Sequence, residues 1–180
     1  MNAIRGLMAE HQNILRALDV LEEIADRVTE VPDEIADDAR AIVGFIQGYA
    51  DELHHGKEES MLFPAMEAAG ELRGGGPIAI MLHDHEQGRA FVRQMDAATD
   101  DLTRDGERFS DAAFDFAALL REHIDKENEV LFPMAESMLP KQVFDDLTER
   151  FRHFDDVQHA EARDKHLRTL EALEAKRPEA

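Results

Sequence analysis

Apolar residues recur three and four positions apart along most of this chain, which is the spacing of amphipathic helices. Runs of strictly alternating polarity, which would indicate strands, are missing. The periodicity predicts helices over about residues 2–29, 33–69, 77–104, 110 to beyond 131, and 140–176. We therefore expect an all-α fold, in which the first four helices form an antiparallel four-helix bundle and the last is an additional C-terminal helix.

Turn-forming residues separate the predicted helices. The clearest break is the glycine-rich segment 70–76, and Pro77 after it suits the first turn of the third helix. The sequences Val31-Pro32-Asp33 and Asp105-Gly106 are typical of turns, and Ser110 is a good N-cap for the fourth helix. We expect residues 1–138 to form the bundle and residues 139–180 to form a helical extension packed on it.

The composition excludes several classes of function. With 40 acidic and 20 basic residues, the formal charge is −20, which disfavours binding to nucleic acid or to an anionic membrane. Cysteine is absent, so disulfides, thiolate metal sites, iron–sulfur clusters and cysteine nucleophiles are excluded. The N-terminal residues lack the apolar core of a signal peptide, and no stretch reaches transmembrane length, which predicts a cytoplasmic protein.

An eleven-residue segment occurs twice. The first copy runs from His54 through Glu58 to a Leu-Phe-Pro sequence, and the second runs from His123 through Glu127 to another Leu-Phe-Pro. In both copies Lys follows the histidine at +3 and Glu follows it at +4. The repeat predicts two similar halves of the bundle, each carrying a His-x-x-x-Glu motif.

A second similarity lies upstream of each copy. Glu10-His11-Gln12 resembles Asp84-His85-Glu86, with His11 lying 43 residues before His54 and His85 lying 38 residues before His123. Each half is therefore predicted to be a helical hairpin with one histidine on its first helix and a His-x-x-x-Glu motif on its second. Stacking two such hairpins gives a bundle with approximate twofold symmetry.

These residues have the chemistry of a metal site. Residues four apart share one helix face, so each motif presents an imidazole and a carboxylate in one direction. If these faces turn inward, six groups meet in the core, where burial without a cation would cost many kcal/mol. Imidazole with carboxylate suits iron, zinc, manganese or copper, and two bridging glutamates with two histidines per ion favour a pair of irons. The six candidates are His11, His54, Glu58, His85, His123 and Glu127.

Other polar residues have simpler interpretations. His55 and Glu59 could supply a fifth ligand or outer hydrogen bonds, but an exposed pair is the favoured interpretation. His83 is expected on the surface, and Tyr49 either donates a hydrogen bond near the site or only packs. Three further histidines of the last helix are more simply surface residues than ligands: His153, His159 and His166. Phenylalanines and methionines near the motifs are expected to pack in the core and to wall the site.

The motifs around Glu10-His11, 54–64, 77–89 and 122–133 resemble those of the hemerythrin-like, or HHE cation-binding, family. The resemblance implies a four-helix bundle that holds two iron ions with an oxo or hydroxo bridge on the six candidates above. Oxygen-carrying hemerythrins have a further histidine four residues from the third-helix histidine, where this chain has Met81 and Arg89. They also place Asp at +5 on the fourth helix, where this chain has Asn128, so simple reversible oxygen carriage is not expected.

The pattern is closer to that of bacterial hemerythrin-like proteins and of the di-iron domain of iron-cluster repair proteins. The main hypothesis is a protein that binds or senses O2, NO or peroxide at the metal pair. Two alternatives remain open: a di-iron redox enzyme that turns over peroxide or NO, and iron storage or donation for the repair of iron centres. The oligomeric state, the physiological ligand and the choice between iron and manganese or zinc also remain open.

Overall fold

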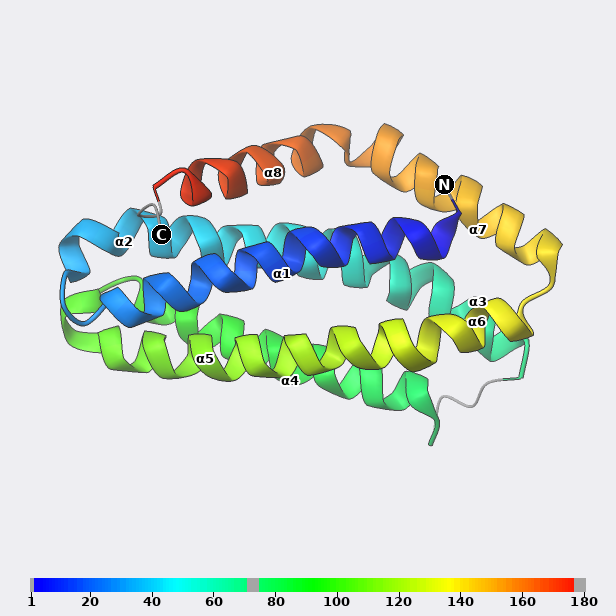
Figure 1. Ribbon diagram of the computed structural model, residues 1–180, viewed down its shortest axis with the longest axis horizontal. Helices are drawn as coiled ribbons and strands as arrows, with labels where there is room; N and C mark the ends of the chain where they lie inside the picture. Colours follow the sequence, from blue (N-terminus) through cyan, green and yellow to red (C-terminus); the bar gives the residue numbers. More distant parts are fainter. Residues whose placement is uncertain (1, 71–74, 177–180) are drawn as a thin grey trace.

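The structure is a computed structural model that describes residues 2–70 and 75–176, and every regular element in these ranges is a helix. The helices form a bundle of four antiparallel rods, as the periodicity predicts (Figure 1). The first rod is α1 (Ala3–Arg27), and the third is α4 (Pro77–Ala98). The second rod joins α2 (Pro32–Phe45), η1 (Ile46–His55), η2 (Glu58–Leu62) and α3 (Phe63–Ala68). The fourth rod joins α5 (Leu102–Lys126), η3 (Glu127–Leu131) and α6 (Phe132–Met138).

The core of the bundle consists of two apolar clusters. One lies toward the turn that joins α1 to α2 and includes Leu21, Ile42 and Phe109. The other lies toward the opposite end and includes Leu7 and Phe132. On every rod the predicted metal-site residues fall at the boundary between the two clusters, and on the fourth rod Ile124 of the first cluster directly follows His123. The site therefore occupies one polar layer between two apolar layers.

The last part of the chain covers one side of the bundle. It contains α7 (Lys141–His153), η4 (Phe154–Gln158) and α8 (Ala160–Glu174), which lie along α1 and α2 and away from α4 and α5 (Figure 1). The sequence predicted one helix here, whereas the structure divides it at His159, whose backbone is not helical (φ −129°, ψ 10°). The break lets the two pieces follow the curved outer surface of the bundle.

The turn between the third and fourth rods was predicted at the wrong place. It lies at residues 99–101, where the Asp101 side chain caps α5 by accepting a hydrogen bond from the backbone N–H of Arg104. Asp105 only kinks α5, and Ser110 lies inside this helix instead of capping it. Gly106 serves close packing: a Cβ there would lie 3.3 Å from the Val28 carbonyl oxygen.

Across the described ranges, no helix combines the length and the apolar character that a membrane span needs.

Candidate metal centre

All six predicted donors lie at the centre of the bundle. Their side chains come from all four rods, and no residue among them is more than 1% exposed: His11, His54, Glu58, His85, His123 and Glu127. Their nitrogen and oxygen atoms belong to two groups, each with all donor atoms within 4.8 Å of one another. One group contains His11 and His54, the other contains His85 and His123, and Glu58 belongs to both.

A wide helical turn follows each motif histidine. Glu58 begins η2 and Glu127 begins η3, and both segments are π-helical. The carbonyl of each glutamate accepts a hydrogen bond from the backbone N–H five residues later, at Phe63 and Phe132. Proline follows each phenylalanine, and a proline ring inside an α-helix clashes with the carbonyl four residues earlier. The wider turn relieves this clash, so the repeated Leu-Phe-Pro sequence explains the local geometry at both glutamates.

Each glutamate lies between the two histidine pairs. Glu58 has its Oε1 3.6 Å from His54 Nε2 and its Oε2 3.6 Å from His85 Nε2. Glu127 has its Oε2 3.1 Å from His11 Nε2 and its Oε1 3.4 Å from His123 Nε2. Both carboxylates thus offer one oxygen to each histidine pair, which is the arrangement that two bridging carboxylates require.

The outer ring nitrogens fix the orientation of the four imidazoles. His54 Nδ1 donates to Glu10 Oε2 at 2.8 Å, and His123 Nδ1 lies 3.5 Å from Asp84 Oδ2. These two acids occupy equivalent positions, each directly before the first-helix histidine of the same hairpin. The repeat therefore extends beyond the six donors to the residues that support them.

The other two histidines are supported by the opposite hairpin. His85 Nδ1 donates to Glu59 Oε1 at 2.7 Å, and His11 Nδ1 donates to Asn128 Oδ1 at 3.0 Å. Glu59 and Asn128 are again equivalent, since each directly follows a central glutamate. Asn128, which departs from the pattern of the oxygen carriers, thus has a defined contact in this chain.

The lysine at +3 of each repeat holds the supporting acid. Lys57 Nζ donates to Glu10, and Lys126 Nζ donates to Asp84 Oδ2 at 3.1 Å. Lys57 also donates to Asp155 of η4 at 2.7 Å and is only 1% exposed, whereas the Lys126 side chain is 34% exposed. Through Lys57, the C-terminal segment η4 is therefore connected to Glu10 and so to the central histidines.

These contacts fit a bound cation. Because Nδ1 of His11, His54 and His85 donates outward, the Nε2 atoms of these rings carry lone pairs. The Nε2 atoms of His11 and His54 nevertheless face each other at 3.0 Å. The Nε2 atoms of His85 and His123 do the same at 3.2 Å. Both carboxylate oxygens of Glu58 are buried without a hydrogen-bond donor among the described residues. A positive ion between these atoms would remove the repulsion and satisfy the buried acceptors.

The environment also sets the protonation of the donors. Burial lowers the pKa of His54 well below its usual value, and the adjacent His11 adds to the fall. Burial raises the pKa of Glu58 well above its usual range, and the nearby Glu127 carboxylate adds to the rise. A neutral imidazole is the form that binds a metal, and the raised pKa of Glu58 means that a cation and a proton compete for this carboxylate.

The favoured interpretation of His55 and Glu59 as an exposed pair was wrong, whereas the alternative of an outer hydrogen bond is found for Glu59. His55 is 5% exposed and faces Asp51, with its Nδ1 3.4 Å from Asp51 Oδ1. Glu59 instead contacts His85 and accepts a hydrogen bond from Arg89 at 2.7 Å. Asp51 lies four residues before His55, so the spacing signals that contact. Glu59 meets His85 and Arg89 only through the packing of η2 against α4.

The remaining histidines lie elsewhere. His83 is exposed, as expected, and so is His153. His159 packs on the Phe154 ring, and the His166 ring lies against Gly48. Neither donor group found in the described residues includes any of these four histidines.

The aromatic side chains near the centre are buried, as expected, and so are Met61, Met66 and Met81, whereas Met134 is half-buried. Phe132 stacks on His11 with the ring centroids 5.4 Å apart, and Phe63 stacks on His85 at 6.0 Å. The phenylalanines of the two Leu-Phe-Pro sequences therefore wall the two sides of the centre. Tyr49 is buried against Phe45 and accepts a hydrogen bond from Asn13 at 2.8 Å.

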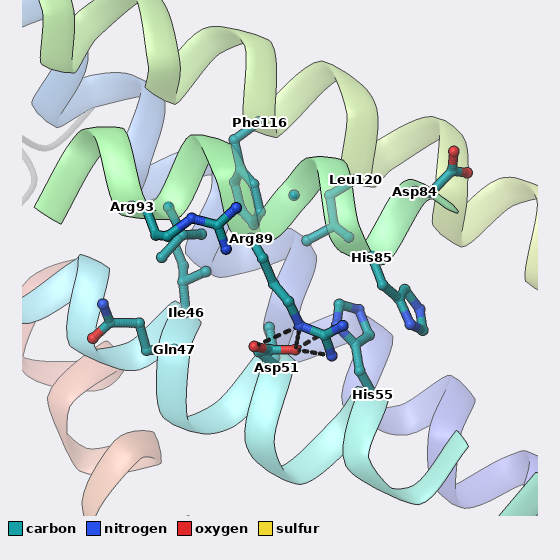
Figure 2. A pocket seen from close by; sticks show the side chains of 13 residues that line it. Ile46, Gln47, Asp51, His55, Asp84, His85, Arg89, Arg93, Phe116 and Leu120 are labelled. Atoms are coloured by element: carbon teal, nitrogen blue, oxygen red, sulfur yellow. Dashed lines mark hydrogen bonds and ion pairs between the residues drawn. The ribbon is translucent and has the colours of Figure 1, made fainter. Parts of the chain in front are cut away.

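A pocket of about 230 Å³ reaches the centre from one side (Figure 2). Exposed Gln47 and Arg93 lie at its outer part, and buried His55 and His85 lie at its inner part. Its remaining wall is mostly apolar, with contributions from Ile46, Ala50, Val92, Phe116 and Leu120. A small molecule can therefore approach the His85 side of the centre without crossing the core.

The fold and its buried donors define a cation-binding helical bundle. The chain belongs to the hemerythrin HHE cation-binding domain family, whose domain matches residues 2–135. This match covers all six predicted donors and bears out the resemblance drawn from the motifs.

Curated proteins similar to this chain include iron-sulfur cluster repair proteins. The protein DnrN of Neisseria gonorrhoeae is 31% identical over 135 residues, which cover 70% of this chain and 85% of that protein. The protein YtfE of Musicola paradisiaca is 33% identical over 88 residues, which cover 46% of this chain and 40% of that protein. The uncharacterized protein Rv1995 of Mycobacterium tuberculosis is 26% identical over 163 residues, covering 88% of this chain and 62% of that protein. No solved structure matches the chain significantly.

Proposed function

We propose that this protein holds two iron ions on the six central donors and binds or senses a small ligand, namely O2, NO or peroxide. The observation that carries the proposal is the position of Glu58 and Glu127, each with one oxygen toward each histidine pair. His11 and His54 would hold one iron, and His85 and His123 the other. When bound, the irons would supply redox chemistry and open positions for the ligand.

The protein's own residues have defined tasks in this proposal. The outer acids and Asn128 orient the imidazoles, so that every Nε2 points inward. Phe63 and Phe132 keep water from both sides of the centre, since each ring stacks on one of its histidines. The pocket beside His85 admits a molecule the size of the proposed ligands.

The first test is the metal content of protein produced without added metal. We expect two irons per chain, and we expect Glu58→Ala and Glu127→Ala each to lose the pair, because neither glutamate can supply the oxygens of the other. Glu129→Ala is the matched control, since Glu129 is exposed two residues from Glu127. Two irons retained in either central variant, or no metal in the wild-type protein, would contradict the proposal.

The second test identifies the ligand. The reduced, iron-loaded protein is mixed rapidly with O2, NO or peroxide while its absorption spectrum is followed. A stable adduct with one of the three supports a binding or sensing protein. Continued turnover of peroxide or NO would favour a redox enzyme instead.

Iron donation is a second candidate function, because the similar proteins of Neisseria gonorrhoeae and Musicola paradisiaca are named for the repair of iron–sulfur clusters. Glu10, Glu59 and Asp84 add negative charge around the donors, which would also help to hold iron for transfer. Incubation of the loaded protein with an apo iron–sulfur acceptor, followed by separation and iron analysis, distinguishes this function. Iron that stays with this chain counts against donation.

A further inference from the structure

His55 is a fifth buried histidine at the centre. Its ring stacks on the His85 ring with the centroids 3.8 Å apart (Figure 2). The His55 ring also lies 5.6 Å from the His123 ring. It also belongs to one of the two donor groups, together with Glu58, His85 and His123. The equivalent position of the second hairpin is Ile124, which is buried and apolar. His55 is therefore a feature of the first hairpin alone.

His55 has the hydrogen-bonding pattern of the other central histidines. Its Nδ1 faces Asp51 at 3.4 Å, as His54 Nδ1 faces Glu10 and His85 Nδ1 faces Glu59. Its Nε2 is buried and has no partner in the described part of the chain. An outer nitrogen on a carboxylate and an unsatisfied inner nitrogen are the marks of an imidazole prepared for a metal.

A single guanidinium holds the orientation of His55 and of His85. Arg89 Nε donates to Asp51 Oδ1 at 2.9 Å, and Arg89 Nη2 donates to Glu59 Oε1 at 2.7 Å (Figure 2 shows the contact with Asp51). These two acids are the outer partners of His55 and His85. The two stacked imidazoles are thus fixed by one shared network on the same side of the centre.

Neighbouring positions on a helix point in different directions, so His54 and His55, at the end of the π-helical segment η1, face different sides of Glu58. His54 lies with His11, with the two Nε2 atoms 3.0 Å apart, whereas His55 lies with His85. The two adjacent histidines therefore contribute one imidazole to each donor group.

We propose that His55 Nε2 is a third imidazole ligand of the metal ion held by His85 and His123. This inference rests on the proposed metal pair and makes its two halves unequal. One ion has three histidines and the other has two, while Glu58 and Glu127 serve both. The His11 side thus has one protein donor fewer.

Proton NMR of the cobalt(II)-loaded protein tests this directly, because each ligating imidazole gives one strongly shifted, exchangeable ring N–H signal. We expect five such signals from the wild-type protein and four from His55→Ala. His83→Ala is the matched control, since His83 is exposed, and it should keep five. In chelator competition, His55→Ala should weaken the binding of one of the two ions at least tenfold, and added imidazole should restore part of this loss.

The outcomes separate the two proposals. Wild-type protein that binds two cobalt ions but shows only four signals overturns the ligand assignment of His55 and leaves the metal pair intact. Wild-type protein that binds no pair of ions overturns the metal pair and the His55 ligand together. If His55→Ala fails to fold, the count of five or four signals in the wild-type protein still decides the question.

Discussion

Lys57 and Lys126 occupy the same position of the repeat, three residues after His54 and His123. Each holds the acid that supports its histidine, but only Lys57 is fully buried, because Asp155 of η4 closes over it. Removing one partner of a buried ion pair destabilises a protein far more than removing one partner of an exposed pair. The two lysines are therefore a natural matched pair of sites.

Lys57→Met should destabilise the metal-free protein by about 3 kcal/mol, because Glu10 and Asp155 are then left without their cation. Lys126→Met should cost less than about 1 kcal/mol, since its pair with Asp84 is partly exposed. Urea unfolding followed by circular dichroism measures both values. Equal losses of stability in the two variants would contradict the prediction that the buried lysine contributes more than the exposed one.

For individual residues, the spacing in the sequence alone predicted the central donors, because a histidine and a glutamate four positions apart share a helix face. Their convergence is found in the structure, and their role as ligands stays a prediction. Among the residues that support these donors, only Glu59 was considered for an outer hydrogen bond, although Glu10 and Asp84 stand directly before histidines and Lys57 was part of the repeat. Their partners lie on other helices, so only the packing of the rods defines them.

The packing of α8 on the second rod depends on a glycine. At Gly48 of η1, a Cβ would lie 2.2 Å from His166 Nε2, so the His166 ring occupies the space of the absent side chain. Gly44 lies one turn earlier on α2 and has nothing within 4 Å of such a Cβ. The two glycines thus separate close packing from the general effect of glycine in a helix.

Gly48→Ala should leave the protein about 1 kcal/mol or more less stable than Gly44→Ala does, because the His166 ring must leave its place. Gly44→Ala should stabilise it by about 0.5–1 kcal/mol, since alanine is the better helix former. Thermal unfolding measures both changes. Adding His166→Ala should remove most of the loss caused by Gly48→Ala, and a loss that persists would contradict this contact.

The helices themselves could be predicted from periodicity, whereas their irregularities could not. The turn expected at Asp105-Gly106 was wrong because Gly106 is used for close approach to Val28, and Asp101 supplies the cap. The π-helical turns at Glu58 and Glu127 had a signal in the repeated Leu-Phe-Pro sequences, where proline interrupts an otherwise helical pattern. The break at His159 has no such signal.

For the molecule as a whole, the centre is a polar layer between two apolar clusters. In the metal-free protein this layer holds facing nitrogen lone pairs and carboxylate oxygens without donors, which is unfavourable for the folded state. The proposed metal ions would remove this cost and add their binding energy to the stability of the fold.

Removal of metal should therefore lower the free energy of unfolding. Free metal at a hundredfold excess over its dissociation constant should contribute about 2.7 kcal/mol per ion. Urea unfolding with and without a chelator measures how much the metal adds to the free energy of unfolding. In Glu127→Ala the chelator should change this free energy only slightly. A wild-type protein that unfolds identically in both conditions would count against a metal in the core.

The chain of contacts from Asp155 through Lys57 and Glu10 to His54 joins the outermost helices to the innermost ring. A displacement of η4 would remove Asp155 from Lys57 and allow the lysine to move away from Glu10. The Glu10 carboxylate, which holds the His54 ring, would then lack its balancing positive charge. Cleavage or binding of a partner at η4 should therefore weaken the binding of the proposed metal pair, and loss of the metal should loosen the packing of η4.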